Sequence, residues 1–292
     1  MCNCGALIKA IDRYIEKVDD DLADTLEAEG YALPKRSLKA AQQIEDEVAE
    51  ALIEETELFT SSTNEAIDLE EWAESVWPGV KATDALAGKL ETIFVERFTE
   101  IMPELVEVYI KRTDKQLILS EVSKATTGWI KRWSKDLGDL MKLDSHKEIE
   151  RILETGLKNG DSIASFTQAI LESGIRDEYY RARRVSLTEV LRAHSVAQQE
   201  AFMQSPAVEG KLWRHTGEYR NEPRQNHVDM DGTIVGKAER FELKGADGET
   251  YAPLYPRDTI LPAKESVNCH CVAEPVVNEE ILGLPLEERQ AL

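Results

Sequence analysis

The residues best suited to chemistry lie in one irregular stretch near the end of the chain, residues 213–271. It contains His215, His227 and two cysteines one residue apart, Cys269 and Cys271. Two thiolates and two imidazoles form a ligand set that suits tetrahedral zinc. The spacing is not that of a standard zinc finger, and side chains two residues apart on a strand do not converge without help from their surroundings. A pair of buried thiols beside a hydrogen-bonded histidine is therefore the competing interpretation.

The same stretch offers a second kind of chemistry. His227, Asp229 and Asp231 could supply a metal ligand and a base, as in a metal-dependent nuclease that acts on DNA. The chain lacks the H-E-x-x-H, G-x-S-x-G and phosphate-binding-loop motifs, and it has no carboxylate cluster of the two-metal kind. We therefore expect a protein without catalytic activity, and the nuclease is the alternative hypothesis.

The elements before this stretch carry apolar residues at helical spacing. After Pro206 the segments shorten, and Gly, Pro and β-branched residues become frequent. We predict an α+β protein with a largely α-helical N-terminal two-thirds and a small, loop-rich α+β C-terminal domain. The predicted domains are 1–145 (an acidic helical arm), 146–205 (a helical segment) and 206–292 (the C-terminal domain). Helices are predicted at 6–27, from 38 onward, from 84 to Pro103, which ends or kinks it, and at 147–158, 163–172 and 177–203.

The net charge of −21 is spread unevenly along the chain. Residues 1–110 hold 9 Lys and Arg against 26 Asp and Glu, whereas residues 111–200 hold 16 against 14. An acidic surface repels the phosphates of DNA, so we expect nucleic-acid contacts only from the middle of the chain. The competing interpretation is that these bases pair with the acidic helices. The candidates are Lys131, Arg132, Lys135, Arg181, Arg183 and Arg184.

The cysteine content and hydropathy indicate the compartment. Four cysteines in 292 residues are too few for a disulfide scaffold, so a reducing cytoplasm is expected. The start of the chain does not have the pattern of a secretory signal, and no apolar run approaches the length of a membrane span. We therefore expect no membrane partner.

Several short blocks occur in an order that is typical of one family. The blocks are Gly160 to Ser162, Arg181 to Glu189 (R-A-x-x-V-x-x-T-E), Trp213, Arg224-x-x-His227, Asp231-Gly232, Tyr255 to Asp258 (Y-P-R-D) and Asn268 to Val272 (N-C-H-C-V). With them, residues 145–277 resemble the Mu F-like minor head proteins of tailed bacteriophages, also called phage head morphogenesis proteins. The rest of the chain carries no resemblance.

The resemblance implies a virion protein present in few copies at or near the portal vertex. Such a protein helps head assembly, genome packaging or ejection by contact and without catalysis. Its implied partners are the phage portal and capsid or scaffold proteins, and packaged DNA. Its implied location is the head of the virion, and the host cytoplasm during assembly.

The resemblance also bears on the metal. Some relatives carry C-x-x-C where this chain has Arg224 and His227, and with the later cysteines these make a zinc site. Charged Arg224 cannot ligate a metal, which leaves His227, Cys269 and Cys271. His215, Asp229 or water could supply the fourth ligand, so a structural zinc ion is the expected cofactor. Alternatively, Arg224 replaces the metal by hydrogen-bonding carbonyl groups.

The first predicted helix has an apolar stripe that suits docking into a partner's groove, with anchors at helical spacing. The candidate partner-binding residues are Leu7, Ile11, Ile15, Val18 and Leu22. A third hypothesis uses the acidic helices instead. In it, the protein is a soluble regulator that mimics DNA and binds a basic partner.

Overall fold

The computed structural model describes residues 21–119, 121–173, 178–216 and 223–292. Contacts group the chain into two compact units, each assembled from separate segments. Unit 1 comprises Met1–Ala41, Glu100–Thr126 and Leu187–Leu292, and unit 2 comprises Gln42–Thr99 and Thr127–Ser186. The predicted division at residues 145 and 205 stays a prediction, since it divides the chain along the sequence and the two units are defined by contacts between separate segments.

The helices are long and occupy most of the chain up to residue 204, as predicted for an α+β protein of this kind. The bounds of the main helices are α2 (Pro34–Ser62), α5 (Leu86–Thr113), α6 (Lys124–Asn159), α7 (Ile163–Glu172) and α8 (Glu178–Gln204). Short helices α3 (Leu69–Glu71) and α4 (Trp77–Thr83) flank a π-helical turn, Trp72–Val76. None of the helices in the described ranges is both long and apolar enough to span a membrane.

Two helix boundaries differ from the predictions. Pro103 lies inside α5 and does not end it, because buried residues on both sides, including Met102 and Leu105, hold the helix in place despite the missing backbone donor. The helix predicted to start at residue 147 is the last part of the longer α6. Its predicted stop is confirmed, since Gly160 has φ +70°, a conformation that glycine adopts without strain.

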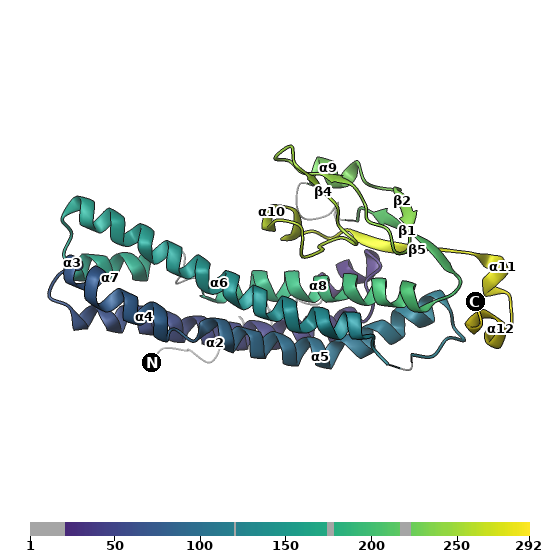
Figure 1. The fold of residues 1–292 in the computed structure, drawn as a ribbon, viewed down its shortest axis with the longest axis horizontal. Helices are drawn as coiled ribbons and strands as arrows, with labels where there is room; N and C mark the ends of the chain where they lie inside the picture. Colours follow the sequence, from purple (N-terminus) through teal and green to yellow (C-terminus); the bar gives the residue numbers. More distant parts are fainter. Residues whose placement is uncertain (1–20, 120, 174–177, 217–222) are drawn as a thin grey trace, which may run out of the picture. The chain divides into compact units, whose positions relative to one another are not determined.

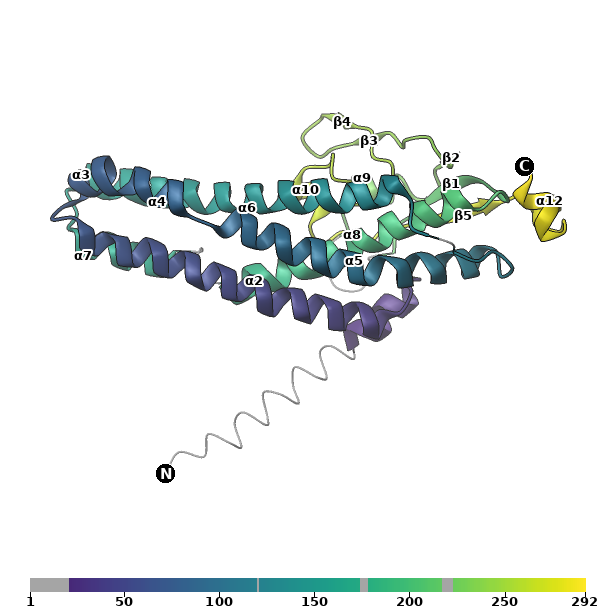
Figure 2. The same cartoon turned by 60° about the horizontal axis from the view of Figure 1, so that its bottom comes forward.

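Unit 2 is held together by a cluster of aromatic and aliphatic side chains. Trp72 stacks on Trp77 with ring centroids 5.2 Å apart and meets Phe166 of α7 edge-on at 4.8 Å. Figure 2 shows α7 beside α2, and α4 beside α6, around this cluster. Burial of several large rings stabilises a helical unit strongly, because each removes a large apolar area from water.

Unit 1 contains the strands. A three-stranded antiparallel sheet has the order β2 (Ile234–Gly236), β1 (Val208–Arg214), β5 (Val272–Val277), so β1 lies in the middle (Figure 1). A separate hairpin pairs β3 (Leu243–Lys244) with β4 (Thr250–Tyr251). Gly210 in β1 is needed for close approach, because a Cβ there would lie 2.9 Å from the carbonyl oxygen of Val235.

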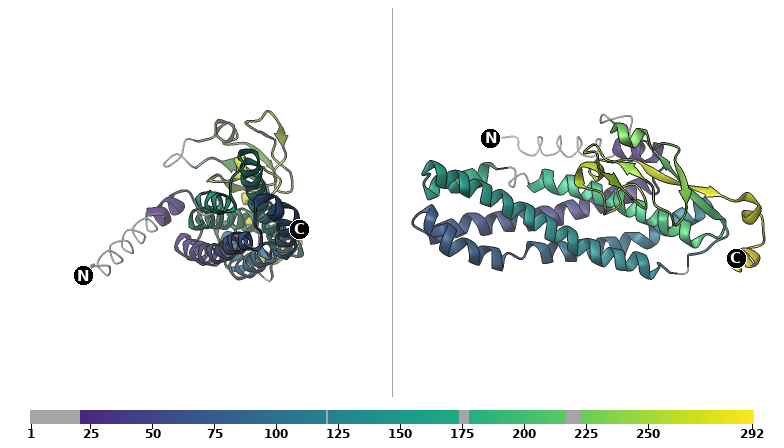
Figure 3. Two further views of the ribbon diagram at one scale, coloured as in Figure 1. Left: turned by 90° about the vertical axis from the view of Figure 1, so that its left-hand side faces the viewer. Right: turned by 45° about the horizontal axis from the view of Figure 1, so that its top comes forward.

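The last two helices follow β5 in unit 1 (Figure 3, right panel, yellow), α11 (Glu279–Leu282) and α12 (Leu286–Gln290). Arg289 of α12 is buried and forms an ion pair with Asp114, at 3.2 Å, just after the end of α5. It also donates to the side chain of Gln116 at 2.7 Å. A buried ion pair between segments so far apart in sequence fixes α12 against this part of unit 1.

Candidate metal centre

Three predicted ligands meet in the core of unit 1. His227 lies in the one-turn helix α9 (Gln225–Val228), and Cys269 and Cys271 follow α10 (Ala263–Ser266) and lead into β5. The Nδ1 atom of His227 is 3.5 Å from Sγ of Cys269 and 3.7 Å from Sγ of Cys271. All three residues are buried, and their ligand atoms lie within 4.8 Å of one another.

The fourth candidate, His215, lies just after β1. Its Nδ1 atom is 3.5 Å from Sγ of Cys271, although it does not belong to the group of three within 4.8 Å. The Nε2 atom of His215 is buried without a hydrogen-bond partner among the described residues. Both cysteines are free, so no disulfide occupies this position. His215 therefore lies close to Cys271 but outside the group formed by His227, Cys269 and Cys271.

The sulfur–nitrogen distances match those of a zinc site. Zinc bonds of about 2.3 Å to sulfur and about 2.0–2.1 Å to nitrogen, at tetrahedral angles, place neighbouring sulfur and nitrogen ligands about 3.5 Å apart. The distances from His227 and His215 to the cysteines are 3.5 to 3.7 Å. The donor set and its spacing therefore fit a tetrahedral zinc ion of the closed, structural kind.

A carboxylate orients the histidine. Oε2 of Glu265 in α10 lies 2.9 Å from Nε2 of His227, and both residues are buried. With the proton on Nε2, Nδ1 is the free lone pair that faces the two sulfurs, which is how carboxylates orient zinc-bound histidines. Asn226 and the backbone N–H of Ala246 also donate to Glu265. Although burial raises the pKa of Glu265, these hydrogen bonds leave it below its usual value.

The cysteine segment is held by its carbonyl groups. The buried guanidinium of Arg257 donates to the carbonyl of Cys269 at 2.6 Å and to that of Cys271 at 2.9 Å. The carbonyl of His270, between them, accepts from the hydroxyl of Tyr31 at 2.8 Å and from that of Thr216 at 2.7 Å. These bonds fix the backbone of the cysteine segment in a conformation in which both thiols lie near His227, whereas two side chains at i and i+2 of a regular strand share a face but lie too far apart to meet one ion.

Arg257 is itself fixed by an unusual backbone and by buried partners. Its φ of 64° is in the left-handed region that few residues other than glycine adopt. Its guanidinium also donates to the hydroxyl of Ser195 at 2.7 Å, and its carbonyl accepts from Arg192 of α8. Backbone strain of this kind persists only where the surroundings determine it, and here they align Arg257 with the cysteines.

The charges favour one thiolate. The thiol of Cys271 donates to the sulfur of Cys269, which lowers the pKa of Cys269 well below its usual value and raises that of Cys271. His227 and the guanidinium of Arg257 add to the lowering at Cys269. Burial lowers the pKa of His227, but Cys269 and Glu265 outweigh it, so the net direction is upward. A thiolate is the form in which cysteine binds zinc.

Arg224 makes no ligand contact and instead donates to the carbonyl of Val267 at 2.6 Å, two residues before Cys269. This is the carbonyl contact that the sequence suggested as one alternative. This hydrogen bond supports the backbone that leads into the cysteine segment. It leaves Nδ1 of His227 and the two cysteine sulfurs available as ligands.

The residues of the nuclease alternative do not form a joint site. Asp229 and Asp231 are exposed, whereas His227 is buried and faces the thiols. Asp231 accepts from the backbone N–H of His215 at 2.8 Å, and Asp229 accepts from Gln225 at 2.7 Å. Among the residues that the structure describes, neither aspartate belongs to a group that could hold a metal ion.

The candidate nucleic-acid-binding residues all lie in unit 2, with Lys131, Arg132 and Lys135 in α6 and Arg181, Arg183 and Arg184 in α8. Arg183 forms an ion pair with Glu45 at 2.8 Å, and Lys135 forms one with Asp139 at 2.6 Å. Arg184 lies over the ring of Tyr180. Acidic side chains thus meet part of the basic charge, and DNA binding by these residues stays a prediction.

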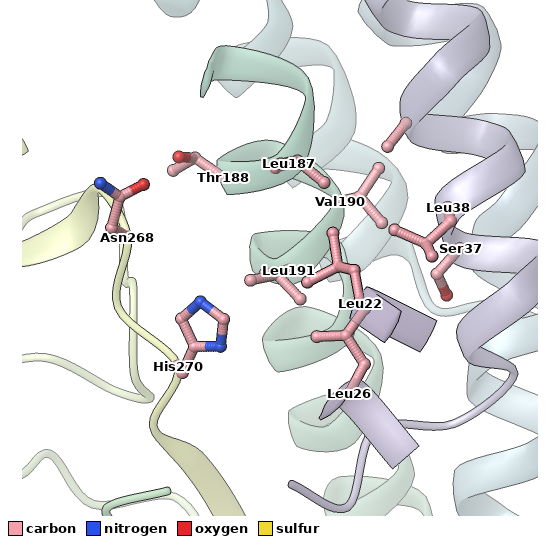
Figure 4. A pocket seen from close by; sticks show the side chains of 11 residues that line it. Leu22, Leu26, Ser37, Leu38, Leu187, Thr188, Val190, Leu191, Asn268 and His270 are labelled. Atoms are coloured by element: carbon pink, nitrogen blue, oxygen red, sulfur yellow. The ribbon is translucent and has the colours of Figure 1, made fainter. Parts of the chain in front are cut away.

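Four of the candidate partner-binding residues, Leu7, Ile11, Ile15 and Val18, lie outside the described residues. The fifth, Leu22, lines a small apolar pocket of unit 1 with Leu26, Leu38 and Leu191 (Figure 4). Residues 21–28 are helical, and the stripe predicted for this helix continues into the pocket. Leu22 therefore packs within the chain, and its role toward a partner stays a prediction.

Several residues that shape the metal centre were not found from the sequence. Tyr31 and Glu29 reach His270, Glu29 with its carboxylate 2.7 Å from Nδ1 of the ring, across a separation of about 240 residues. No local pattern predicts such contacts. Glu265 had a weak signal, since it lies four residues before Cys269 in a short helical turn.

Comparisons with known proteins identify the family of this chain. A family model described as "Phage Mu protein F like protein" matches residues 147–274, which include all four candidate ligands. The chain belongs to this family, whose members are phage head morphogenesis proteins.

A relative among curated proteins is the uncharacterized protein YqbB of Bacillus subtilis (strain 168). It is 41% identical over 210 residues, which are 69% of this chain and 68% of the relative. No solved structure matches the chain significantly. Neither comparison supports the nuclease alternative.

Proposed function

We propose that this protein is a minor structural component of a tailed-phage head that acts at the portal vertex during head assembly. Family membership over residues 147–274 is the observation that carries the proposal. The proposed role extends to genome packaging or ejection, and it works by contact and without catalysis. The proposed partners are the portal and capsid or scaffold proteins, and the packaged DNA through unit 2. The proposed location is the virion head, and the host cytoplasm before assembly.

We propose further that His227, Cys269, Cys271 and His215 hold a structural zinc ion. The 3.5 to 3.7 Å sulfur–nitrogen distances and the carboxylate behind His227 support the proposal. Bound by these residues, zinc would crosslink α9, the end of β1 and the cysteine segment, in a region with short strands and little regular structure. Burial of three ligands leaves little access for a substrate, in keeping with a structural role.

The acidic charge suits a protein that works beside packed DNA. Residues 1–110 carry a large excess of acidic side chains, which limits adhesion to the genome. Contacts to DNA would then be confined to the basic residues of α6 and α8, and contacts to protein partners to apolar faces. The DNA-mimic hypothesis explains the same charge, but it does not explain membership of a head morphogenesis family.

Complementation tests this function. In a phage or prophage that encodes the chain, a null allele should yield defective heads by electron microscopy, and the wild-type gene supplied in trans should restore them. Deletion of residues 1–20 removes most of the apolar stripe that is predicted to bind a partner. It preserves Leu22, Glu29 and Tyr31 of unit 1, and with them the contacts to His270. We expect this deletion to reduce recovery of the chain with the portal protein. Normal heads without the gene would refute the proposal.

A further inference from the structure

A second group of buried polar residues lies inside unit 2, separate from the His/Cys centre. Glu55 comes from α2, Asp84 from the junction between α4 and α5, and His146 from α6. Their ligand atoms lie within 4.8 Å of one another, and all three residues are buried. Oδ2 of Asp84 lies 2.7 Å from Nε2 of His146. Three segments distant in sequence therefore bring two carboxylates and an imidazole to one point among apolar side chains.

Glu55 is the unusual member of the group. It is 3% exposed, and neither of its carboxylate oxygens has a hydrogen-bond partner among the described residues. The hydroxyl of Ser145 and the carboxyl group of Asp84 are its polar neighbours, and the guanidinium of Arg181 donates to the Ser145 hydroxyl at 3.2 Å. A buried carboxyl group without partners is costly, and in native proteins such a group commonly marks an ion or a water.

The donor set indicates which ligand would satisfy it. Two carboxylates and one imidazole, supplied by different helices of a bundle, are ligands of first-row divalent cations such as Mn²⁺, Fe²⁺ and Zn²⁺. Two carboxylates also balance the charge of one such cation. We propose that Glu55, Asp84 and His146 form a binding site for a divalent transition-metal ion in unit 2.

The residues around the three proposed ligands favour a metal site, and a proton on Glu55 is what would compete with the metal ion. The rings of Trp77 and Phe59 lie edge-on to His146, at centroid distances of 5.3 and 5.9 Å, so they orient the imidazole and exclude water. The ammonium of Lys142 donates to the backbone carbonyl of Asp84 at 2.5 Å and lies 3.9 Å from its carboxylate, so its charge is already satisfied by the carbonyl and leaves the carboxylate open to a cation. Without metal, a proton on Glu55 is the competing occupant, because burial raises the pKa of Glu55 to about 8.

Manganese distinguishes this site from the His/Cys centre. Mn²⁺ prefers oxygen ligands, whereas the thiolates of Cys269 and Cys271 prefer zinc. The full-length protein is titrated with Mn²⁺ in physiological salt and excess Mg²⁺, and the signal of free Mn²⁺ is followed by electron paramagnetic resonance. Wild-type protein should bind one equivalent, and Glu55→Gln should lose at least tenfold in affinity. Glu57→Gln is the matched control, since Glu57 is an exposed residue of the same helix.

A second measurement locates the ion without a variant. Bound Mn²⁺ broadens the NMR signals of nearby protons, and Trp77 lies beside His146 whereas Trp213 lies in unit 1. We expect the indole N–H signal of Trp77 to broaden at substoichiometric Mn²⁺ while that of Trp213 persists. Equal binding by the wild type and Glu55→Gln would overturn the proposal. Broadening of Trp213 before Trp77, or no binding above the Mg²⁺ background, would also overturn it.

Discussion

The buried histidine of unit 1 predicts a specific loss of stability in acid. His194 of α8 is fully buried, with Nε2 2.8 Å from the hydroxyl of Ser37 and Nδ1 2.8 Å from that of Tyr109. Burial, together with the positive charges of Arg257 and Arg112, lowers its pKa from 6.5 to about 3. The folded protein therefore holds His194 neutral at every pH at which it is expected to be folded.

The direction of the effect follows from proton linkage. Between pH 6.5 and about 3 the unfolded chain binds a proton at His194 and the folded protein does not. Stability from this residue is therefore fully present above pH 6.5 and is lost as the pH falls toward 3. At 1.36 kcal/mol for each pH unit, lowering the pH from 7 to 5 costs roughly 2 kcal/mol at this one residue.

Urea unfolding followed by circular dichroism at pH 7 and pH 5 measures this loss. Many carboxylates also titrate in this range, so the wild type is compared with His194→Gln, which keeps one hydrogen-bond donor and one acceptor but does not titrate. The variant should lose about 2 kcal/mol less than the wild type between the two pH values. Equal losses in the two proteins would refute the assignment of a neutral, desolvated His194.

Further predictions concern the metal centre and the C-terminal helices. Cys271→Ser should reduce the zinc content from about one ion per chain to near zero by elemental analysis, whereas His270→Gln, whose ring faces away from the ligands toward Glu29, should retain it. Arg257→Lys cannot bridge the carbonyls on both sides of His270 and should lower the unfolding free energy by about 2–4 kcal/mol in urea titrations; an unchanged midpoint would contradict this. Arg289→Ala leaves its buried aspartate partner unpaired, so amide exchange in α12 should accelerate by more than tenfold, and unchanged protection would show that the ion pair does not hold the helix.

The sequence predicted the elements well where a local pattern determines them. The stop at Gly160 follows from a backbone requirement that few residues meet. The sequence allowed Asp161 or Ser162 to start the next helix, and Ser162 caps it, with its side chain accepting from the N–H of Ser165. The sequence predicted that Pro103 ends or kinks its helix; it does not end α5, because local preference yields to the burial of the residues around it. A long helix can therefore pass through a proline that sequence pattern treats as a stop.

The candidate ligands of the proposed metal centre were predictable from the sequence, but the residues that support them were not. His227, Cys269 and Cys271 were identified from residue type, and the structure brings them together. Tyr31 and Arg257 were not assigned a role, because their bonds to the cysteine segment depend on how distant parts of unit 1 fold together. The group of Glu55, Asp84 and His146 in unit 2 was not predicted for the same reason, since its three members come from segments far apart in the sequence.

The central claim is that this chain is a structural part of a phage head. Quantitative mass spectrometry of purified, nuclease-treated particles from the phage that encodes it tests this claim most directly. The account predicts the intact chain in mature particles at a few copies for each portal. Its absence from particles, while it remains abundant in the infected cell, would contradict the account.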